Sequence, residues 1–227
     1  MKISLVIPVH NLEKHIEPLL VSLKFQNYDH EEIEPIFICD ACEDRTHEII
    51  EDYLAGSFPA LRILDRNYRS SGLGRNDGLE LASGKYIWLL DGDDWLIDNH
   101  AISKVLAYFE ARPDAEVLRV NWLSNNFGVP NYPFTVWQWI QTAERAKAVK
   151  FTSRKYDDDV EWVKAWMLKF DFLGCDTLAS PLYFYNYMRE GSVMQKRLTE
   201  EKNNGLSCDT AGRAQDKEEQ PKDSKES

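Results

Sequence analysis

The sequence lacks an excess of basic residues and lacks any long apolar run. Its 227 residues include 27 Lys and Arg against 38 Asp and Glu, which gives a formal net charge of −11. Proteins that bind nucleic acid usually neutralise its phosphates with a basic surface, so this balance argues against a nucleic-acid partner. No apolar segment reaches the roughly 20 residues that a membrane-spanning helix needs. Both of these protein classes are therefore disfavoured.

The N-terminus also lacks the features of a secretory leader. Residues 1–11, MKISLVIPVHN, contain a strand-length apolar segment with no small-residue cleavage site behind it. We therefore expect a cytoplasmic protein. Tryptophan-bearing segments at 135–149 and 156–170 leave peripheral association with the inner face of a membrane open. Because these segments lack a cationic polar face, packing of their tryptophans in the core is favoured.

Cysteine is scarce, and its pattern does not complete a metal or redox motif. Of four cysteines, Cys39 and Cys42 form a Cys-x-x-Cys pair, while Cys175 and Cys208 stand alone. A structural zinc site normally takes a second pair at similar spacing, and a thioredoxin-like pair opens a helix directly after a strand. We therefore expect free, buried or half-buried thiols in a reducing compartment.

The apolar content that is present is sufficient for a substantial core. Hydrophobic residues make up 43% of the chain and aromatic residues 12%. From about residue 196 onward the aromatics disappear, and charges of both signs mix with Ser, Gln and Pro. This composition predicts a disordered tail over residues 196–227. Residues 1–195 are expected to form one domain, with halves at 1–115 and 116–195.

Strand-like and helix-like segments alternate along the first hundred residues. Strands are predicted at 3–9, 34–40, 61–65 and 85–91, and helices at 17–26, 45–56 and 74–84. Gly56 is expected to cap the second helix and Gly84 to end the third. Such alternation is typical of an α/β fold with a mostly parallel central sheet flanked by helices, in which ligands bind at the carboxyl ends of the strands.

The second half of the chain is less regular. Helices are predicted at 100–110, 135–149 and 156–170, a strand at 116–123, and an extended aromatic segment at 181–193. Trp122, Trp137 and Trp139 are candidates either for the core or for stacking on sugar rings.

The segment that follows the predicted strand 85–91 is acidic. Asp91, Asp93 and Asp94 flank Gly92 within four positions. A surface turn is the simple alternative, because Asp and Gly are common turn residues. Mg²⁺ and Mn²⁺ prefer oxygen ligands, and Mg²⁺ is often held by one or two carboxylates together with substrate phosphates. The spacing therefore predicts a divalent cation on Asp91 and Asp93, with Gly92 allowing close approach of a ligand.

Five segments occur in the order and approximate spacing of one family. They are LVIPVHN, CDACEDRT, GLGRNDGLELASGKYIWLLDGDD, YDDDVEW and YNYMREGSV. The sequence resembles the family 2 glycosyltransferases over about residues 3–194. Members of that family are inverting enzymes with the Rossmann-like, A-type nucleotide-sugar-binding fold. The resemblance assigns the nucleotide sugar to residues 1–115 and the acceptor and catalysis to 116–195.

The resemblance implies a set of donor-binding residues. The backbone of Pro8, Val9 and Asn11 would line the uridine pocket, and Asp40 would accept a hydrogen bond from the uracil imide. Cys39, Ala41 and Cys42 depart from the family pattern, which has an acidic residue, Gly and Ser at these positions.

Further positions match motifs that contact the sugar and the phosphates. Arg75 and Asn76 would face the ribose, the phosphate or the sugar, and Asp91 and Asp93 would bind the metal, with Gly92 beside the donor. Tyr185, Arg189 and Ser192 match a closing segment that folds over the diphosphate in the family.

The family's catalytic base aligns with Asp158 and Asp159. The adjacent Asp157 leaves the register open by one residue. Acidic residues before a helix also act as caps and as partners of the helix dipole, which is the structural alternative.

These residues together predict an inverting glycosyltransferase that depends on Mn²⁺ or Mg²⁺. Its donor would be a nucleotide sugar, with UDP-sugar as the first choice, and its acceptor a hydroxyl of a glycan or of a lipid-linked saccharide, as in polysaccharide biosynthesis. Two alternatives are a non-catalytic nucleotide-sugar-binding protein and a phosphatase of the haloacid dehalogenase type. The latter class carries its Asp-x-Asp after the first core strand, whereas here the first strand ends in Pro-Val-His-Asn.

Overall fold

The computed structural model describes residues 2–125, 134–153, 158–170, 175–187, 189–192, 195–197 and 199–200. The chain divides into two compact units, Met1–Tyr187 and Met188–Ser227. Most of the segment predicted to be a disordered tail lies outside the described residues. The first unit holds all the strands and helices that follow.

The first half of the chain forms the elements that its hydrophobic pattern predicts. The strands are β1 (Ile3–Val9), β2 (Ile33–Asp40), β3 (Arg62–Arg66) and β4 (Tyr86–Leu89). The helices are α1 (Glu17–Lys24), α2 (Thr46–Leu54), α3 (Ser71–Leu81) and α4 (Ala101–Ala111), with a 3-10 turn at His30–Glu32. Every residue of β1, β2 and β4 is buried, as expected for strands covered on both faces.

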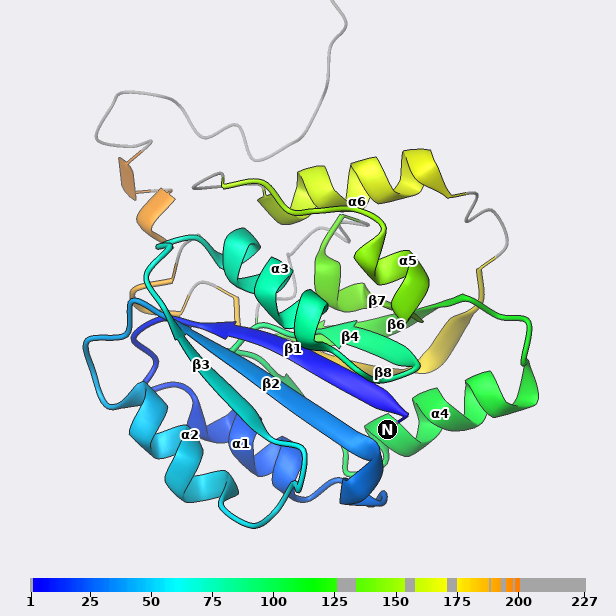
Figure 1. The fold of residues 1–227 in the computed structure, drawn as a ribbon, viewed down its shortest axis with the longest axis horizontal. Coiled ribbons are helices and arrows are strands. Elements are labelled where there is room, and N and C mark those ends of the chain that lie inside the picture. Colours follow the sequence, from blue (N-terminus) through cyan, green and yellow to red (C-terminus); the bar gives the residue numbers. More distant parts are fainter. Residues whose placement is uncertain are drawn as a thin grey trace, which may run out of the picture. The chain divides into compact units, whose positions relative to one another are not determined.

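The strands assemble into one eight-stranded sheet of order β3-β2-β1-β4-β7-β6-β8-β5. β3, β2, β1 and β4 run parallel, as do β6 and β8, while the pairings that involve β7 or β5 are antiparallel. The carboxyl ends of the first strands therefore meet at one end of the sheet (Figure 1). The mostly parallel α/β sheet that the sequence predicts is confirmed.

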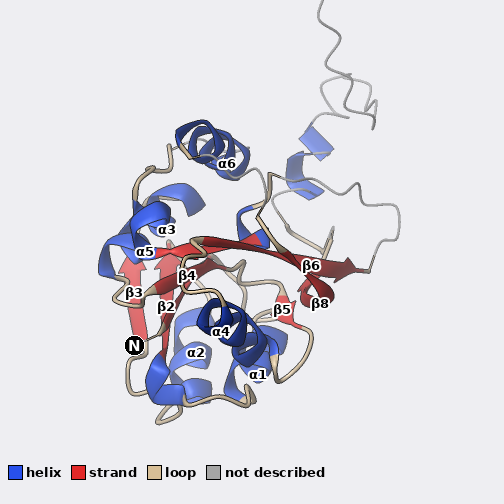
Figure 2. Ribbon diagram, turned by 90° about the vertical axis from the view of Figure 1, so that its right-hand side faces the viewer, coloured by secondary structure: helices blue, strands red, loops and turns tan. Residues whose placement is uncertain are grey.

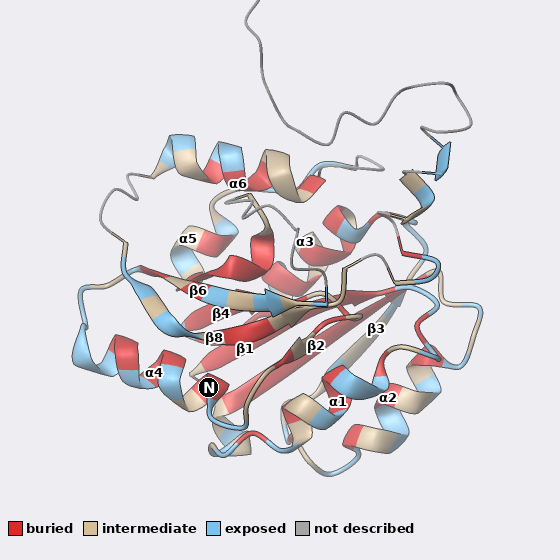
Figure 3. Ribbon diagram, turned by 180° about the vertical axis from the view of Figure 1, so that it is seen from behind, coloured by how far each residue is buried: buried red, intermediate tan, exposed pale blue. Residues whose placement is uncertain are grey.

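Helices cover both faces of the sheet. Seen edge-on, α1, α2 and α4 lie on one face, and α3, α5 and α6 on the other (Figure 2). Each layer has its own apolar cluster, one joining Leu20, Ile50 and Val105, the other joining Leu79, Trp162 and Trp166. Burial is concentrated in the strands and on the inner faces of the helices (Figure 3).

The second half completes the sheet with β5 (Trp95–Leu96), β6 (Val117–Ser124), β7 (Trp139–Thr142) and β8 (Thr177–Tyr185). Its helices are α5 (Ala143–Lys147) and α6 (Asp158–Lys169), and a 3-10 turn covers Val136–Gln138. The prediction of a single helix over 135–149 is wrong. β7 runs between β4 and β6. The backbone hydrogen bonds that residues 139–141 form with these two strands outweigh the local preference for a helix.

The two glycine predictions have different outcomes. Gly56 lies just beyond α2 in the left-handed conformation, with φ +67°, as a helix-ending glycine does. α3 ends at Leu81 rather than at Gly84. The buried carboxylate of Glu34 accepts hydrogen bonds from the backbone and side chain of Ser83, at 2.7 and 3.0 Å, and this draws the chain out of the helix.

The tryptophans of α6 lie in the core. Trp162 and Trp166 are buried, and the Trp162 ring stacks on Phe151 at 4.9 Å between centroids. Core packing therefore accounts for the apolar face of this helix. Among the described helices, none is both long and apolar enough to cross a bilayer.

Candidate functional site

Polar residues follow β1, β2 and β4 where these strands end. β1 and β2 are in register to Val9 and Cys39, so Asn11 and Asp40 emerge close together. The backbone nitrogen of Leu90 bonds to Val6 on β1, and the chain then enters Asp91. The sheet thus brings the donor-binding positions predicted at Pro8, Val9, Asn11, Asp40 and Asp91 to one end.

The three aspartates after β4 divide into two kinds. Asp94 is 1% exposed, and its carboxylate accepts hydrogen bonds from the Tyr183 hydroxyl at 2.6 Å and from the Asn186 backbone nitrogen at 2.8 Å. The Tyr183 oxygen in turn accepts the backbone N–H of Asp91 at 3.1 Å. Asp94 therefore holds the loop, whereas Asp91 and Asp93 are only half-buried.

Gly92 lets this loop lie against the end of β1. A methyl group at its Cα would come within 2.6 Å of the Val9 side chain and 2.7 Å of Leu12. Gly92 is thus required by packing within the protein, and the close approach of a ligand to this residue stays a prediction.

A buried arginine joins this loop to α6. Arg75, on α3, is 5% exposed. Its guanidinium donates to Asp91 at 2.6 Å and to Asp158 at 3.4 Å, and it lies 5.5 Å from the centre of the Phe151 ring. The Arg75 guanidinium therefore links the loop predicted to bind the metal to the helix start predicted to carry the base.

Burial and charge act against each other in this group. Burial raises the pKa of Asp91; Arg75 opposes that shift, and the nearby Asp93 adds to it. For Arg75, burial would lower the pKa, but Asp91 and Asp158 outweigh this and raise it. Burial, followed by the charges of Asp93 and Asp91, raises the pKa of Asp94 well above its usual range.

The two described aspartates at the start of α6 differ in surroundings. Asp158 is 7% exposed and accepts a hydrogen bond from Ser71 at 3.0 Å in addition to that from Arg75. Asp159 is half-buried. Its removal from water raises its pKa to about 6, against the opposing attraction of Arg75. Asp157, the third candidate, lies outside the described residues.

The contact between α3 and α6 needs a residue without a side chain. At Gly72, a methyl group would lie 2.7 Å from the Asp158 carboxylate and 2.7 Å from the backbone oxygen of Thr152. Gly72 thus permits the approach that lets Ser71 and Arg75 reach Asp158.

Asn76 is turned toward the protein rather than away from it. Its side-chain nitrogen donates to the backbone oxygen of Phe151 at 3.0 Å, and its side-chain oxygen accepts the Phe151 N–H at 2.9 Å. Both polar atoms of this amide are therefore in use. Asn76 therefore holds the segment before α6, and its contact with the donor stays a prediction.

The carboxylate of Asp40 also faces inward. It accepts the backbone N–H groups of Tyr68, Arg69 and Ser70 at 2.6, 3.0 and 2.6 Å. It thereby fixes the chain just before α3. A hydrogen bond from Asp40 to a nucleobase stays a prediction, and it would have to share these oxygens.

The loops after β1 and β2 are tied to each other. The Asn11 side chain accepts the backbone N–H of Glu43 at 2.8 Å, and the Thr46 hydroxyl accepts that of Leu12 at 2.7 Å. Ala41 has φ +53°, in the left-handed region that favours glycine. The family pattern's glycine at this position thus meets a backbone requirement that this chain satisfies with alanine.

Sequence reasoning missed several residues that build the site. Tyr183 and Ser71 lie outside the five motif segments, and Gly72 lies at the start of one of them but was assigned no role. Tyr183 bonds to Asp91, 92 positions away along the chain. Ser71 and Gly72 lie against Asp158, 87 and 86 positions away. The signal available was weak, since an aromatic in an extended segment or a glycine at a helix start has many uses.

The two positions predicted to close over the diphosphate belong to the second unit. There the Arg189 side chain donates to the backbone oxygen of Glu190 at 3.0 Å. The Ser192 hydroxyl accepts the backbone N–H of Gln195 at 3.1 Å. Their role at the diphosphate stays a prediction.

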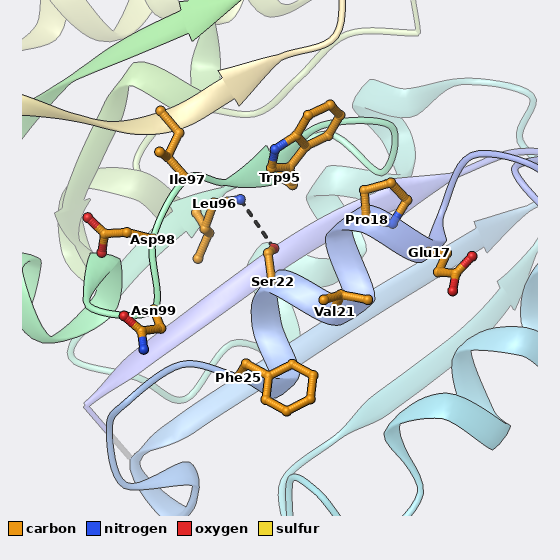
Figure 4. A pocket seen from close by; sticks show the side chains of 10 residues that line it. All are labelled: Glu17, Pro18, Val21, Ser22, Phe25, Trp95, Leu96, Ile97, Asp98 and Asn99. Atoms are coloured by element: carbon orange, nitrogen blue, oxygen red, sulfur yellow. Dashed lines mark hydrogen bonds between the residues drawn. The ribbon is translucent and has the colours of Figure 1, made fainter.

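A separate pocket of about 450 Å³ lies between α1 and the chain around β5 (Figure 4). Val21, Phe25 and Trp95 supply apolar walls, and the Ser22 hydroxyl accepts the Leu96 N–H at 3.2 Å. Its lining includes none of the predicted site residues.

Comparison with known proteins identifies the domain. The family described as Glycosyl transferase family 2 matches residues 4–173, well over half of the chain. The chain belongs to this family. It carries a glycosyltransferase domain, and the resemblance drawn from its motifs is confirmed.

Two relatives are enzymes that modify poly(ribitol-phosphate). TarS of Staphylococcus aureus, a beta-N-acetylglucosaminyltransferase, is 32% identical over 135 residues, which is 59% of this chain and 23% of TarS. A beta-glucosyltransferase of Bacillus spizizenii is 37% identical over 98 residues, which is 42% of this chain and 15% of that protein. The matched part is thus less than a quarter of either relative.

Solved structures show the same fold. TarS residues 1–349 in complex with UDP-GlcNAc match with a TM-score of 0.76 at 23% identity, covering 86% of this chain and 61% of that one. The mannosyltransferase PcManGT of Pyrobaculum calidifontis, in complex with GDP-Man and Mn2+, matches with a TM-score of 0.65 at 14% identity, covering 94% and 66%. The A-type fold expected from the motifs is confirmed.

Proposed function

We propose that this domain transfers a sugar from a nucleotide sugar, first of all a UDP-sugar, to a hydroxyl of a glycan or lipid-linked acceptor. The observation that carries the proposal is the Arg75 bridge. It places the acidic loop after β4 beside the start of α6, at the end of the sheet where such folds bind ligands. The relative TarS, crystallised with UDP-GlcNAc, supports the choice of donor.

Asp91 and Asp93 suit a divalent cation. Asp94 is engaged by Tyr183 and Asn186, and the half-buried Asp91 and Asp93 offer two carboxylates, the number that Mg²⁺ commonly takes beside substrate phosphates. Asp93 raises the pKa of Asp91, and a cation between them would relieve this repulsion. A bound Mn²⁺ or Mg²⁺ would supply electrostatic stabilisation of the leaving diphosphate.

Asp159 is the proposed base. Asp158 is committed to Ser71 and Arg75, whereas Asp159 is half-buried and has a pKa of about 6. An ionised Asp159 would take the proton of the acceptor hydroxyl while the hydroxyl oxygen bonds to the anomeric carbon. The bond from that carbon to the diphosphate oxygen breaks at the same time, the diphosphate leaves with the electron pair, and the configuration inverts. Asp158 and Arg75 would hold Asp159 in position.

Half-buried aromatic residues beside the acidic loop are candidates for the acceptor side. Trp122 packs edge-on against Tyr185 at 6.0 Å, and Tyr185 against Tyr187 at 5.7 Å. The backbone nitrogen of Asn186, the residue after Tyr185, donates to Asp94 at 2.8 Å, so this aromatic group lies beside the acidic loop. Burial, then the charges of Asp94 and Asp91, raises the pKa of Tyr185. Trp137 and Trp139 are buried in the core and are withdrawn as sugar-stacking candidates.

A donor-binding experiment tests the cation and the nucleotide together. UDP-GlcNAc, UDP-glucose and GDP-mannose are titrated into the chain by calorimetry with Mn²⁺, with Mg²⁺ and with chelator. We expect a UDP-sugar to bind in the presence of the cation, and Asp93→Ala to lose most of the affinity together with the cation dependence. Equal affinity in Mn²⁺ and in chelator would remove the metal from the proposal.

Release of UDP separates transfer from mere binding. A transferase releases UDP slowly from its donor even without acceptor, whereas a non-catalytic binding protein does not. The phosphatase alternative is not favoured, since the chain belongs to a glycosyltransferase family. It would require phosphate release from monoesters.

A further inference from the structure

Cys39 and Cys42 are the feature that the glycosyltransferase proposal does not use. Read from the sequence, they form half of a zinc motif without a second half. In the fold, two other elements bring further donors to them. Cys39 lies at the end of β2, Asp65 is its register partner on β3, and His47 lies in the first turn of α2.

The donor atoms of these residues lie close together. The Cys39 sulfur, a ring nitrogen of His47 and a carboxylate oxygen of Asp65 all fall within 4.8 Å of one another. His47 Nδ1 and the Asp65 oxygen are 2.8 Å apart. Cys42 lies three residues beyond Cys39, and its thiol donates to the backbone oxygen of Val9, the register partner of Cys39 on β1, at 3.6 Å. A turn of this side chain toward Cys39 would add a fourth donor to the three.

We propose that Cys39, Cys42, His47 and Asp65 form a binding site for a thiophilic divalent cation, with Zn²⁺ as the ion of choice. Two sulfurs, one imidazole and one carboxylate make up a donor set that zinc accepts in tetrahedral geometry. Neighbouring donors of such a site lie about 3.3 to 3.8 Å apart, given zinc–ligand distances of 2.0 to 2.3 Å. The His47–Asp65 pair, now 2.8 Å apart, must therefore open slightly when the ion binds.

The surroundings indicate how the ion would reach the site and what it would stabilise. Cys39 is buried, whereas the side chains of His47 and Asp65 are 36% and 72% exposed, so the ion enters from solvent and ends beside the sulfurs. On binding, the two thiols lose their protons to solvent. The ion would join β2, β3 and α2 one residue before Asp40, and would stiffen the strand end that holds the chain before α3.

This site differs from the proposed Mn²⁺ or Mg²⁺ site in its chemistry. Asp91 and Asp93 offer only oxygen, which suits hard ions, while sulfur selects softer ones. Co²⁺ is therefore the probe of choice, because thiolate ligation gives it a strong sulfur-to-cobalt charge-transfer absorption in the near ultraviolet, which oxygen ligands do not give.

The test is a Co²⁺ titration of the full, reduced chain without oxygen. We expect one equivalent to produce the sulfur band, and one equivalent of Zn²⁺ to remove it and to raise the melting temperature. His47→Ala and Asp65→Asn should weaken Co²⁺ binding at least about tenfold, since even residues that merely orient ligands contribute that much. Cys39→Ala should abolish the band. The two surface variants keep the test valid if Cys39→Ala does not fold.

Three controls separate this site from the rest of the protein. Cys175→Ala and His100→Ala, a half-buried cysteine and an exposed histidine elsewhere, should leave the band and the affinity unchanged. Asp93→Ala should also leave them unchanged while it alters donor binding, so failure of either proposal is visible separately. The absence of a sulfur band at one equivalent, or unchanged affinity in His47→Ala, would overturn the zinc site.

Discussion

The Arg75 guanidinium bonds to Asp91 at 2.6 Å and reaches Asp158 at 3.4 Å, so one buried side chain spans two segments that lie 67 residues apart in sequence. Without the guanidinium, the half-buried carboxylate of Asp91 and the buried carboxylate of Asp158 would both lose this positively charged partner. Removal of one partner from a buried ion pair typically costs roughly 3–5 kcal/mol.

We therefore expect Arg75→Met to lower the free energy of unfolding by about 3 kcal/mol in urea denaturation, the lower end of that range because Asp91 is partly exposed. Arg75→Lys should lose less stability but still lose transfer, because a single ammonium cannot reproduce a planar fork with two partners. Arg45→Met, at an exposed pair with Glu48, is the control and should change little. An unchanged urea midpoint in Arg75→Met would contradict the bridge.

Asp159→Asn separates chemistry from folding. We expect transfer to fall at least about a hundredfold, because the amide cannot take a proton. Since the folded state holds this proton more tightly than the unfolded chain does, ionisation of Asp159 costs stability as the pH rises from about 4 to about 6. At pH 7 the variant should therefore melt at the same temperature as the wild type or higher, with donor affinity retained.

Asp157→Asn and Asp158→Asn resolve the register of the base. Asp158→Asn should destabilise the fold, because Arg75 loses a charged partner. Asp114→Asn, at an exposed position, should change neither the transfer rate nor the stability. Near-normal transfer in all three acidic-run variants would place the base elsewhere.

The pH profile of the wild type carries the same assignment. A base with a pKa of about 6 is ionised above that value and protonated below it. We expect kcat/KM to increase with pH below about 6 and to be constant above it. The profile is to be measured at saturating cation. An acid limb near pH 4 would indicate an exposed carboxylate in place of Asp159.

Tyr183→Phe removes only a hydroxyl, yet that hydroxyl serves both Asp94 and the Asp91 backbone. Leaving a buried polar group without its partner costs about 1–3 kcal/mol. We expect this loss in urea denaturation, together with weaker cation-dependent donor binding, because the loop that carries Asp91 and Asp93 loses an anchor. Tyr53→Phe, on α2, is the matched control. If the two variants behave alike, the hydroxyl does not hold the loop.

Ala41→Gly is expected to stabilise the protein. A left-handed conformation costs a residue with a side chain about 1–2 kcal/mol, while glycine costs about 0.4–1 kcal/mol through the entropy of the unfolded chain. The net gain should be about 0.5–1 kcal/mol, seen as a melting temperature a few degrees higher. The same change at helical Ala111 should have the opposite sign. A lower melting temperature for Ala41→Gly would show that its side chain contributes packing.

The sequence predicted those parts of the fold in which local pattern and final environment agree. Segments 3–9 and 34–40 are apolar throughout, and both are buried strands. β7 was missed because residues 139–142 carry bulky apolar and polar side chains in no clear alternation, and their partners on β4 and β6 are set by tertiary structure.

The site shows the same division. Motifs and strand ends located Arg75, Asp91 and Asp158, but they did not show which side chains face inward. Asn76 and Asp40 proved to be bonded to backbone groups 75 and 28 to 30 residues away. Such pairings depend on how α3 sits on the sheet, which no local pattern encodes.

The position of β7 has a consequence for how this protein is made. β4 has β1 on one side, and its other edge is covered only when residues 139–142 arrive. During synthesis, the nascent chain therefore carries an open, fully apolar strand edge until more than fifty further residues have emerged. Open edges of this kind recruit other strands and promote aggregation. Division of the gene at residue 115 would make that temporary exposure permanent, so we expect the segments on either side of this position to fold as one unit.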